Sequence, residues 1–306
     1  MKILSRRAFL SIGSQLGLLA FLPPVFVSRS HFRLFKRPYQ PDADLFVARG
    51  GKAADLVDRV VAGLGGMSRF VHKGDVVAVK PNMSWDRTPA QGANTNPEVV
   101  AEVVKLCLEA GAKKVRVFDR TCNEAKRSYE HSGVADAAKK AGAEVYFPYK
   151  RNYVSVKIPD GERLHSWKIY KDVLDSDVLI NLPTAKHHSL SQVTLGIKNL
   201  MGYLGNDRGK IHRHFDQKIV DIASVLHPGL TILDATRLLL RNGPQGGNLD
   251  DVKWIYTVIG GTDMVAVDSF GASLFGLNPD DLGFLVDAHK RGLGELDLKK
   301  VHIHQV

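Results

Sequence analysis

One stretch decides the fold of this chain: Asp177-Val-Leu-Ile-Asn-Leu-Pro-Thr-Ala-Lys-His-His-Ser-Leu-Ser-Gln-Val-Thr-Leu-Gly-Ile-Lys-Asn-Leu-Met-Gly202. Residues 178–182 are almost all apolar, which is typical of a buried strand in a parallel sheet. Pro183 lacks an N–H donor, so we expect the strand to end there. A loop carrying Lys186, His187 and His188 would follow. Because ligands of open α/β sheets bind at the carboxyl ends of strands, these basic side chains indicate a site for an anionic ligand or a metal.

Strands and helices alternate on both sides of this stretch. The hydrophobic pattern predicts strands at 45–48, 75–80, 114–118, 144–147, 178–182, 230–233, 254–259 and 301–303. It predicts helices at 52–64, 97–110, 134–141, 215–226, 263–275 and 279–289. The alternation indicates an α/β fold with a mostly parallel, Rossmann-like sheet flanked by helices. An Asp160-Gly161 turn between two short runs predicts a β-hairpin insertion near 150–170.

The N-terminus resembles a targeting segment. Ser5-Arg-Arg-Ala-Phe-Leu10 is followed by an apolar run, a pattern typical of a twin-arginine export signal. We therefore predict a signal or N-terminal anchor at 1–30, a linker at 31–43 and an α/β domain at 44–306. The protein would be exported, and would be periplasmic or attached to the outer face of the cytoplasmic membrane through its N-terminal segment. Whether the signal is cleaved stays open.

The net charge of +10 does not indicate a nucleic-acid partner. Seven of the excess positive charges lie in residues 1–37, which contain no acidic residue, so the remainder of the chain is close to neutral.

The two cysteines, Cys107 and Cys122, limit the redox chemistry of the chain itself. An exported location permits a disulfide between them without requiring one. Two thiols cannot supply the four thiolates of a typical iron–sulfur cluster. Any such cluster would belong to a redox partner protein.

Polar side chains occupy the predicted carboxyl ends of four strands: Lys80, Asp119, Asn181 and Asp234. If the strands are parallel, these side chains meet at one rim of the sheet and form a cleft there with the loops that follow. We expect an anionic substrate or cofactor in this cleft. The predicted catalytic residues are His188, for proton transfer or metal ligation, with Lys186 and Asp119. The predicted ligand-binding residues are Lys80, Asn82, Lys198, Asn199 and Asp234.

A metal ion is the alternative occupant. His212 and His214 are two residues apart, a spacing that reaches one metal from a strand or an extended loop. Together with His187 they form a candidate metal set, although no zinc-binding pattern is matched. For each of these residues separately, and for Asp119 and Asp234, a local role such as capping a helix or satisfying loop N–H groups is the other interpretation.

Several motifs together resemble one family. They occur in the order Val-Lys80-Pro-Asn82-Met, Thr95-Asn-Pro97, Val-Phe-Asp119, Asn181-Leu-Pro-x-x-Lys186-x-His188, Val-Thr194-Leu-Gly-Ile-Lys198-Asn199-Leu-Met-Gly202, Gly243-Pro and Asp263-x-Val-Ala-Val-Asp268. This combination, over roughly residues 45–276, resembles the domain-of-unknown-function 362 family (DUF362). A fainter likeness, resting on Lys and His near a strand end, is to lactate racemase-type proteins, in which such residues hold a nickel–nucleotide cofactor.

The family resemblance implies an α/β fold and a link to redox chemistry, because many members carry a ferredoxin-like Cys-rich segment. This sequence contains no such segment. We therefore expect a cofactor-dependent, redox-linked enzyme that binds an anionic substrate or cofactor. The alternative is a non-catalytic periplasmic protein that binds a metal or ligand and serves a redox partner.

Overall fold

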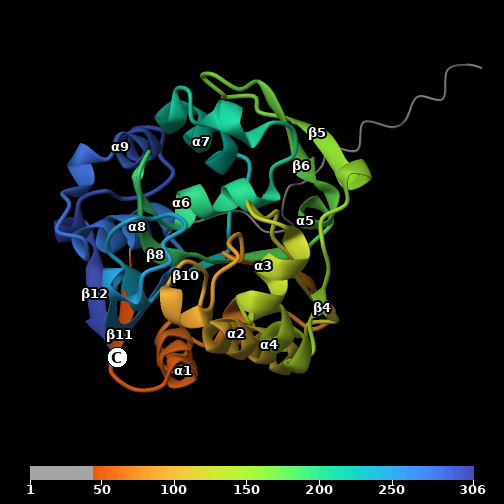
Figure 1. Ribbon diagram of the computed structural model, residues 1–306, viewed down its shortest axis with the longest axis vertical. Helices are drawn as coiled ribbons and strands as arrows, with labels where there is room; N and C mark the ends of the chain where they lie inside the picture. The colour runs from red at the N-terminus through yellow and green to blue at the C-terminus, as the bar shows by residue number, and fades with distance from the viewer. Residues whose placement is uncertain (1–43) are drawn as a thin grey trace, which may run out of the picture. The chain divides into compact units, whose positions relative to one another are not determined.

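The computed structural model describes residues 44–306 (Figure 1). They form a ten-stranded mixed sheet with helices on both faces, and a separate two-stranded sheet. The α/β fold class predicted from the alternation of strands and helices is confirmed. The predicted twin-arginine signal at 1–30 and the linker at 31–43 lie outside the described residues.

The main sheet is mostly parallel. From one edge to the other its strands are β12 (His302–Gln305), β1 (Asp44–Arg49), β11 (Val252–Gly261), β10 (Leu230–Leu239), β7 (Val178–Leu182), β2 (Val76–Pro81), β3 (Lys114–Val117) and β4 (Glu144–Val145). The strands from β10 to β4 are parallel, and β12 is parallel to β1. Only β11 among these runs antiparallel to its neighbours, β10 and β1.

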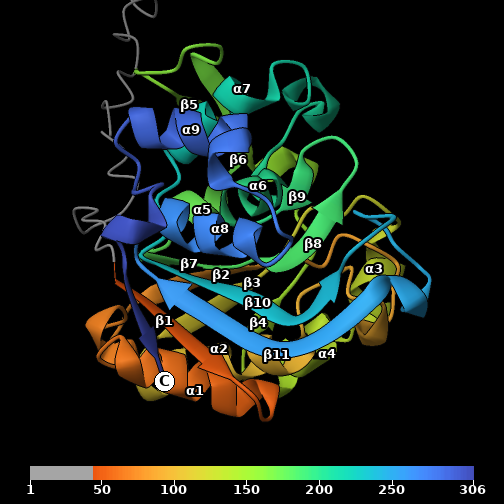
Figure 2. The ribbon, with the colours of Figure 1, turned by 90° about the vertical axis from the view of Figure 1, so that its left-hand side faces the viewer.

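Two layers of helices cover the sheet (Figure 2). One face carries α1 (Ala53–Gly63), α2 (Pro97–Glu109) and α4 (Val134–Lys140). The other carries α5 (Lys171–Leu174), α6 (Gly196–Asn199), α7 (Phe215–Ala223), α8 (Met264–Ser273) and α9 (Gly283–Lys290). In β2, Val77 and Val79 pack against the first layer and Ala78 against the second. The central strands are continuously apolar because both of their faces are buried.

The segment after β7 is not the predicted loop. Residues 184–188 form β8 (Thr184–His188), which pairs with β10 and with the short antiparallel strand β9 (Gln192–Thr194). Pro183 does interrupt the ladder, but its carbonyl accepts the N–H of Asp234 at 2.9 Å. The chain then resumes pairing along β10. Lys186 and His188 are therefore strand residues with a fixed direction.

Two other elements differ from the prediction. β10 runs on to Leu239, so Asp234 lies in the middle of a strand and not at its carboxyl end. Helix α3 (Ala125–His131) was not predicted, and begins after Glu124, whose carboxylate accepts the N–H groups of Lys126 and Arg127. The predicted hairpin is present as β5 (Tyr153–Lys157) and β6 (Ser166–Tyr170).

From residue 44 onward, no helix combines the length and the apolar character required to cross a bilayer. Both cysteines are free thiols: Cys107 is buried in α2, and Cys122 is exposed in the loop after β3. The disulfide that an exported location permits is not formed.

Candidate functional site

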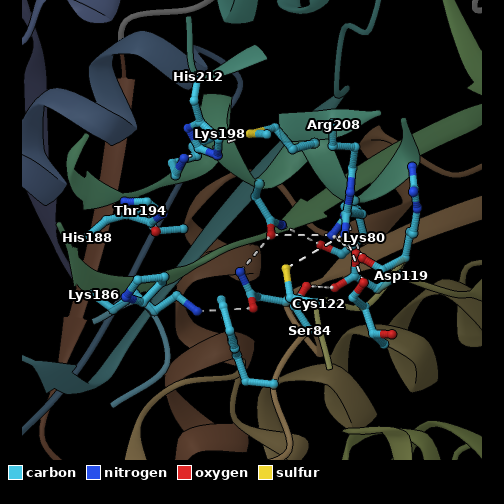
Figure 3. Close-up of a pocket in the computed structure, with 18 of the residues that line it drawn as sticks. Lys80, Ser84, Asp119, Cys122, Lys186, His188, Thr194, Lys198, Arg208 and His212 are labelled. Atoms are coloured by element: carbon cyan, nitrogen blue, oxygen red, sulfur yellow. Dashed lines mark hydrogen bonds and ion pairs between the residues drawn. The ribbon is translucent and has the colours of Figure 1, made fainter. Parts of the chain in front are cut away.

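The carboxyl ends of β2 and β3 open into a cavity of about 440 Å³ (Figure 3). Its lining comes from these strand ends, from β8 and from the segment 194–212. Five basic side chains and two carboxylates line it, so it is strongly electropositive. The basic residues are Lys80, Arg120, Lys186, Lys198 and Arg208. A cavity of this size and charge suits a small organic anion.

Lys80 and Asp119 form a buried ion pair at the floor of the cavity. Lys80 Nζ lies 3.0 Å from Asp119 Oδ1 and donates to the carbonyl of Pro81 at 2.6 Å. The other carboxylate oxygen of Asp119 accepts from the N–H of Met83 and the hydroxyl of Ser84. Burial lowers the pKa of Lys80, and the Asp119 carboxylate opposes that shift. Asp119 Oδ1 contacts Lys80 as an ion pair and accepts no hydrogen bond among residues 44–306. The pair and the contacts of Oδ2 hold the ends of β2 and β3 together.

Three asparagines connect the strand ends to α6. The Asn199 amide donates to the carbonyl of Lys80 and to Asn181 Oδ1, each at 2.9 Å. Asn181 donates in turn to the carbonyl of Gly196 at 3.0 Å. Asn82 Nδ2 lies 3.4 Å from Asn199 Oδ1. The predicted binding residues Asn82 and Asn199 therefore lie in the cavity wall and fix its shape.

Lys186 enters the cavity from β8. Its ammonium donates to Asn82 Oδ1 at 3.3 Å and to the carbonyl of Ala93, and lies 5.7 Å from the ring centroid of Trp85. Among the described residues it has no carboxylate partner. Burial lowers the pKa of Lys186 to about 7. A bound anion would therefore stabilise the charged form of Lys186.

Lys198 enters from α6 and is surrounded differently. Its Nζ lies 4.5 Å from the ring centroid of Phe215 and 3.8 Å from Met201 Sδ. It also has no carboxylate partner within residues 44–306, and no oxygen atom there accepts a hydrogen bond from it. Burial lowers the pKa of Lys198 to about 7.

His188 points into the cavity because it is two residues from Lys186 on the same strand. Its Nδ1 accepts the N–H groups of Leu190 at 3.1 Å and of Ser191 at 3.4 Å. Burial, reinforced by the charge of Lys198, holds the pKa of His188 far below its usual range. The neutral ring must then carry its proton on Nε2, since Nδ1 is an acceptor.

His212 lies beside His188, with 6.0 Å between the ring centroids. Burial lowers its pKa as well, and its Nδ1 is buried without a hydrogen-bond partner in the described part of the chain. The hydroxyl of Thr194, which also lines the cavity, is buried and unbonded among the same residues. Both residues line the cavity, and neither of these two polar atoms has a hydrogen-bond partner among residues 44–306.

The predicted metal ligands are not brought together. His187 points away from Lys186 and His188, because neighbouring strand residues face opposite sides, and its Nδ1 accepts the N–H of Gly243 at 3.1 Å. His214 is exposed and precedes α7 in a left-handed conformation. No group of three or more His, Cys, Asp or Glu side chains in residues 44–306 is arranged to hold a metal ion.

Asp234 does not line the cavity, contrary to its predicted binding role. One oxygen accepts the N–H of Asn96 at 2.7 Å, at the start of α2, and the other accepts the N–H and hydroxyl of Thr236. The buried guanidinium of Arg237 lies 3.4 Å from it. The local interpretation of Asp234 therefore holds, and its carboxylate ties β10 to the start of α2.

The Gly-x-x-x-x-x-Gly spacing of residues 196–202 has a steric reason. A Cβ on Gly202 would lie 2.5 Å from Lys80 Cε and closer still to Asp119, and one on Gly196 would lie 2.7 Å from Asp268 Oδ1. Asp268 accepts the N–H groups of Gly196 and Ile197 at 2.6 and 2.8 Å. The two glycines and Asp268 thus place Lys198 and Asn199 against the strand ends.

The sequence reasoning missed three residues at the cavity mouth: Arg120, Cys122 and Arg208. Arg208 donates to the carbonyls of Arg120 and Thr121 at 2.7 and 2.8 Å, and lies 3.7 Å from Cys122 Sγ. Arg120 follows Asp119 directly, so its position after a strand end was a usable signal. Arg208 follows no recognisable strand end and carried no such signal.

The chain is similar in sequence to known proteins. A thylakoid-associated protein of Synechocystis sp. is 29% identical over 238 residues, covering 75% of this chain and 72% of the relative. The lactate racemase apoprotein from Thermoanaerobacterium thermosaccharolyticum aligns with a TM-score of 0.48 at 11% identity, over 78% of this chain and 58% of that chain. The sequence model of the family described as "Domain of unknown function (DUF362)" matches residues 77–273. With well over half of its length matched, the chain belongs to the DUF362 family.

Proposed function

We propose that this protein is an enzyme that binds a small organic anion in the cavity at the strand ends. One observation carries the proposal: Lys186 and Lys198 are both buried, line the same cavity and lack a carboxylate partner within the described chain. Burying an unpaired ammonium is costly. A carboxylate or phosphate bound between the two would offset that cost and restore the charged state of both lysines.

His188 supplies a hydrogen-bond donor for the reacting oxygen in the proposed enzyme. Its backbone contacts orient the ring and leave Nε2–H as the donor on the cavity side. Because the pKa of the ring is low and its Nδ1 is occupied, His188 stays neutral and stabilises, through this hydrogen bond, negative charge that develops on the ligand. Asp119 is not a free base, because its oxygens are taken by Lys80, Met83 and Ser84. We assign Asp119 a positioning role.

The test is anion affinity in charge-removing variants. Titration calorimetry would follow the binding of a panel of small carboxylates and phosphates to the wild type, Lys186→Met and Lys198→Met. Each variant should bind about 10- to 100-fold more weakly, the effect of losing one charge-assisted hydrogen bond. Lys140→Met, which removes an exposed lysine of α4, is the matched control. Unchanged affinity in both cavity variants would refute the proposal.

A second candidate is a ligand-binding protein without turnover. The observation that favours it is the engaged state of Asp119, the buried carboxylate of the cavity lining. His188→Gln separates the two functions. If the protein is an enzyme, this variant keeps its anion affinity and loses turnover. If it is a binding protein, both the wild type and the variant release the native ligand chemically unchanged.

The export route and the redox link belong to the same proposal. They rest on the Arg6-Arg7 pair and on the family resemblance, and the cavity geometry bears on neither. Replacing both arginines with lysine should retain the protein in the cytoplasm, as measured by cell fractionation. Export of that variant at the wild-type level would remove the twin-arginine route from the proposal.

A further inference from the structure

The two unpaired lysines of the cavity differ in what their amino groups contact. Lys186 donates to two oxygen acceptors, Asn82 Oδ1 and the Ala93 carbonyl, which suit an ammonium ion. Lys198 has no oxygen acceptor within the described residues and contacts a sulfur atom and a ring face. An ammonium ion in water makes about three hydrogen bonds. The Phe215 ring attracts a cation and offsets part of this loss, but no oxygen acceptor replaces the missing hydrogen bonds, so burial favours the neutral amine.

A neutral, buried lysine amine that faces a cavity is a nucleophile toward carbonyl carbon. Lys186 can hold an anionic group in the same cavity, and the unbonded hydroxyl of Thr194 offers a further polar contact. We propose that the ligand is a 2-oxo acid: Lys186 binds its carboxylate, and Lys198 attacks its neighbouring carbonyl to form an imine. This inference rests on the proposed function, because it assigns a substrate class to the same anion site.

The step balances without an oxidant or a reductant. The lone pair of Lys198 Nζ forms a C–N bond, and the π electrons of the carbonyl move to its oxygen. One of the two nitrogen protons passes to that oxygen to give a carbinolamine. The hydroxyl group, which accepts a hydrogen bond from His188 Nε2–H, takes up the remaining nitrogen proton as the C–O bond breaks, and it leaves as one water molecule. The product is an imine that water can hydrolyse back to the free amine and the 2-oxo acid.

The lowered pKa of Lys198 is consistent with its role as the nucleophile, and the different contacts of the two amino groups assign the roles. Burial lowers the pKa of Lys198 to about 7, so a substantial fraction of its amine is neutral at neutral pH. The charge of Lys198 also contributes to the lowered pKa of His188, which places the two groups close enough to interact.

Trapping with glyoxylate, the smallest carboxylate with a neighbouring carbonyl, tests the inference. The full-length protein would be incubated with glyoxylate and cyanoborohydride, which reduces an imine to a stable secondary amine, and peptides would be mapped by mass spectrometry. We expect one adduct, at Lys198, with the mass of glyoxylate less one oxygen atom. Because the label is located on the wild-type protein, the result does not depend on the folding of a variant.

Two variants sharpen the outcome. Lys198→Arg should abolish the cavity adduct, and Lys186→Gln should lower it at least tenfold while leaving trapping of the uncharged propionaldehyde at Lys198 intact. Calorimetric binding of glyoxylate without an adduct would overturn the imine and leave the proposed anion site standing. Labels spread over exposed lysines, without preference for Lys198, would also overturn it. Absence of both binding and adduct would contradict both proposals.

Discussion

The Lys80–Asp119 ion pair shows how single residues set up the site. Both partners are buried, and each charge faces the other while the Lys80 ammonium and Asp119 Oδ2 hydrogen-bond to nearby backbone groups. A paired charge of this kind holds strand ends in place and leaves ligand recognition to neighbouring groups. Lys186 and Lys198, which lack such a partner within the described residues, are the cations that remain for a ligand.

Breaking the ion pair should destabilise the fold. Lys80→Met leaves the Asp119 carboxylate buried without a cation, which costs about 3–5 kcal/mol in the free energy of unfolding. The double variant with Asp119→Asn should lose less than the sum of the single losses, because neither charge is then left alone. Urea unfolding of Lys80→Met, Asp119→Asn and the double variant measures the three losses in the free energy of unfolding. Additive losses would show that the two side chains do not stabilise each other.

Anion affinity should fall as the pH rises through about 7. Lys186 and Lys198 bind an anion best as ammonium ions, and each has a pKa of about 7 in the free protein. Binding therefore takes up protons above that pH and is strongest below it. Calorimetry with malonate, which has no carbonyl group, at a series of pH values measures this. A flat profile between pH 6 and about 9 would contradict the lowered pKa values.

At the scale of elements, the segment from Thr194 to Gly202 packs between the end of β2 and helix α8. Its backbone runs so close to β2 and α8 that side chains are excluded at positions 196 and 202. This is the physical reason for the glycines of the family motif. It also explains why Asp268, far away in the sequence, belongs to the same motif.

Gly202→Ala should disrupt this contact. The added methyl group overlaps the Lys80–Asp119 pair, and overpacking of this kind costs about 1–3 kcal/mol. Gly229→Ala is the control, because a Cβ there has no neighbour closer than 3.9 Å. Thermal unfolding of both variants gives the comparison. Equal stability of the two would mean that the segment shifts without cost.

Asp268→Asn should weaken both stability and ligand binding. The amide keeps one acceptor oxygen for two N–H groups, so one backbone donor of α6 loses its partner, at a cost of about 1–3 kcal/mol. Lys198 loses its fixed position in the same change. Asp263→Asn, which alters the cap of α8, is the control for stability alone. Equal anion affinity in the two variants would argue against a positioning role for Asp268.

Most elements followed from local pattern, and the exceptions have physical causes. The buried strands and amphipathic helices were predictable because their apolar spacing is regular. β8 was not, since Thr-Ala-Lys-His-His has neither an apolar run nor an alternation. Without that strand, sequence spacing could not tell that Lys186 and His188 share a side while His187 faces the other way. Asp234 was misplaced for a related reason, because nothing in the sequence marks β10 as running past it.

At the scale of the whole molecule, the site depends on the arrangement of the mixed sheet. β10 is parallel to β7 at its start and then pairs with β8, which carries Lys186 and His188 over the ends of β7 and β2. Residues from 80 to 212 therefore meet in one cavity. The convergence of Lys80, Asp119 and Asn181 followed from the parallel order of strands, whereas the closing of the cavity by 194–212 depends on tertiary contacts.

The ligand-free protein should become more stable as the pH rises from about 7 toward 10.5. The ordinary lysine pKa is 10.5, and burial lowers those of Lys186 and Lys198 to about 7. Between these pH values the two lysines are protonated in the unfolded chain and deprotonated in the folded chain. Burial of the two lysines therefore lowers the free energy of unfolding by its full amount below pH 7, and this loss shrinks as the pH rises above 7. The stability difference from a Lys186→Met, Lys198→Met double variant should shrink over this range in chemical denaturation. A constant difference would contradict the shifts.

The two cysteines differ in their accessibility to a thiol-reactive label. Cys122 is exposed at the cavity mouth, whereas Cys107 is buried in α2, where burial raises the pKa of its thiol. A thiol-reactive fluorophore should therefore attach to Cys122 alone in the native state, and its emission would follow cavity occupancy in real time. Cys107 would react only once α2 separates from the sheet, so one labelling experiment distinguishes ligand binding from unfolding.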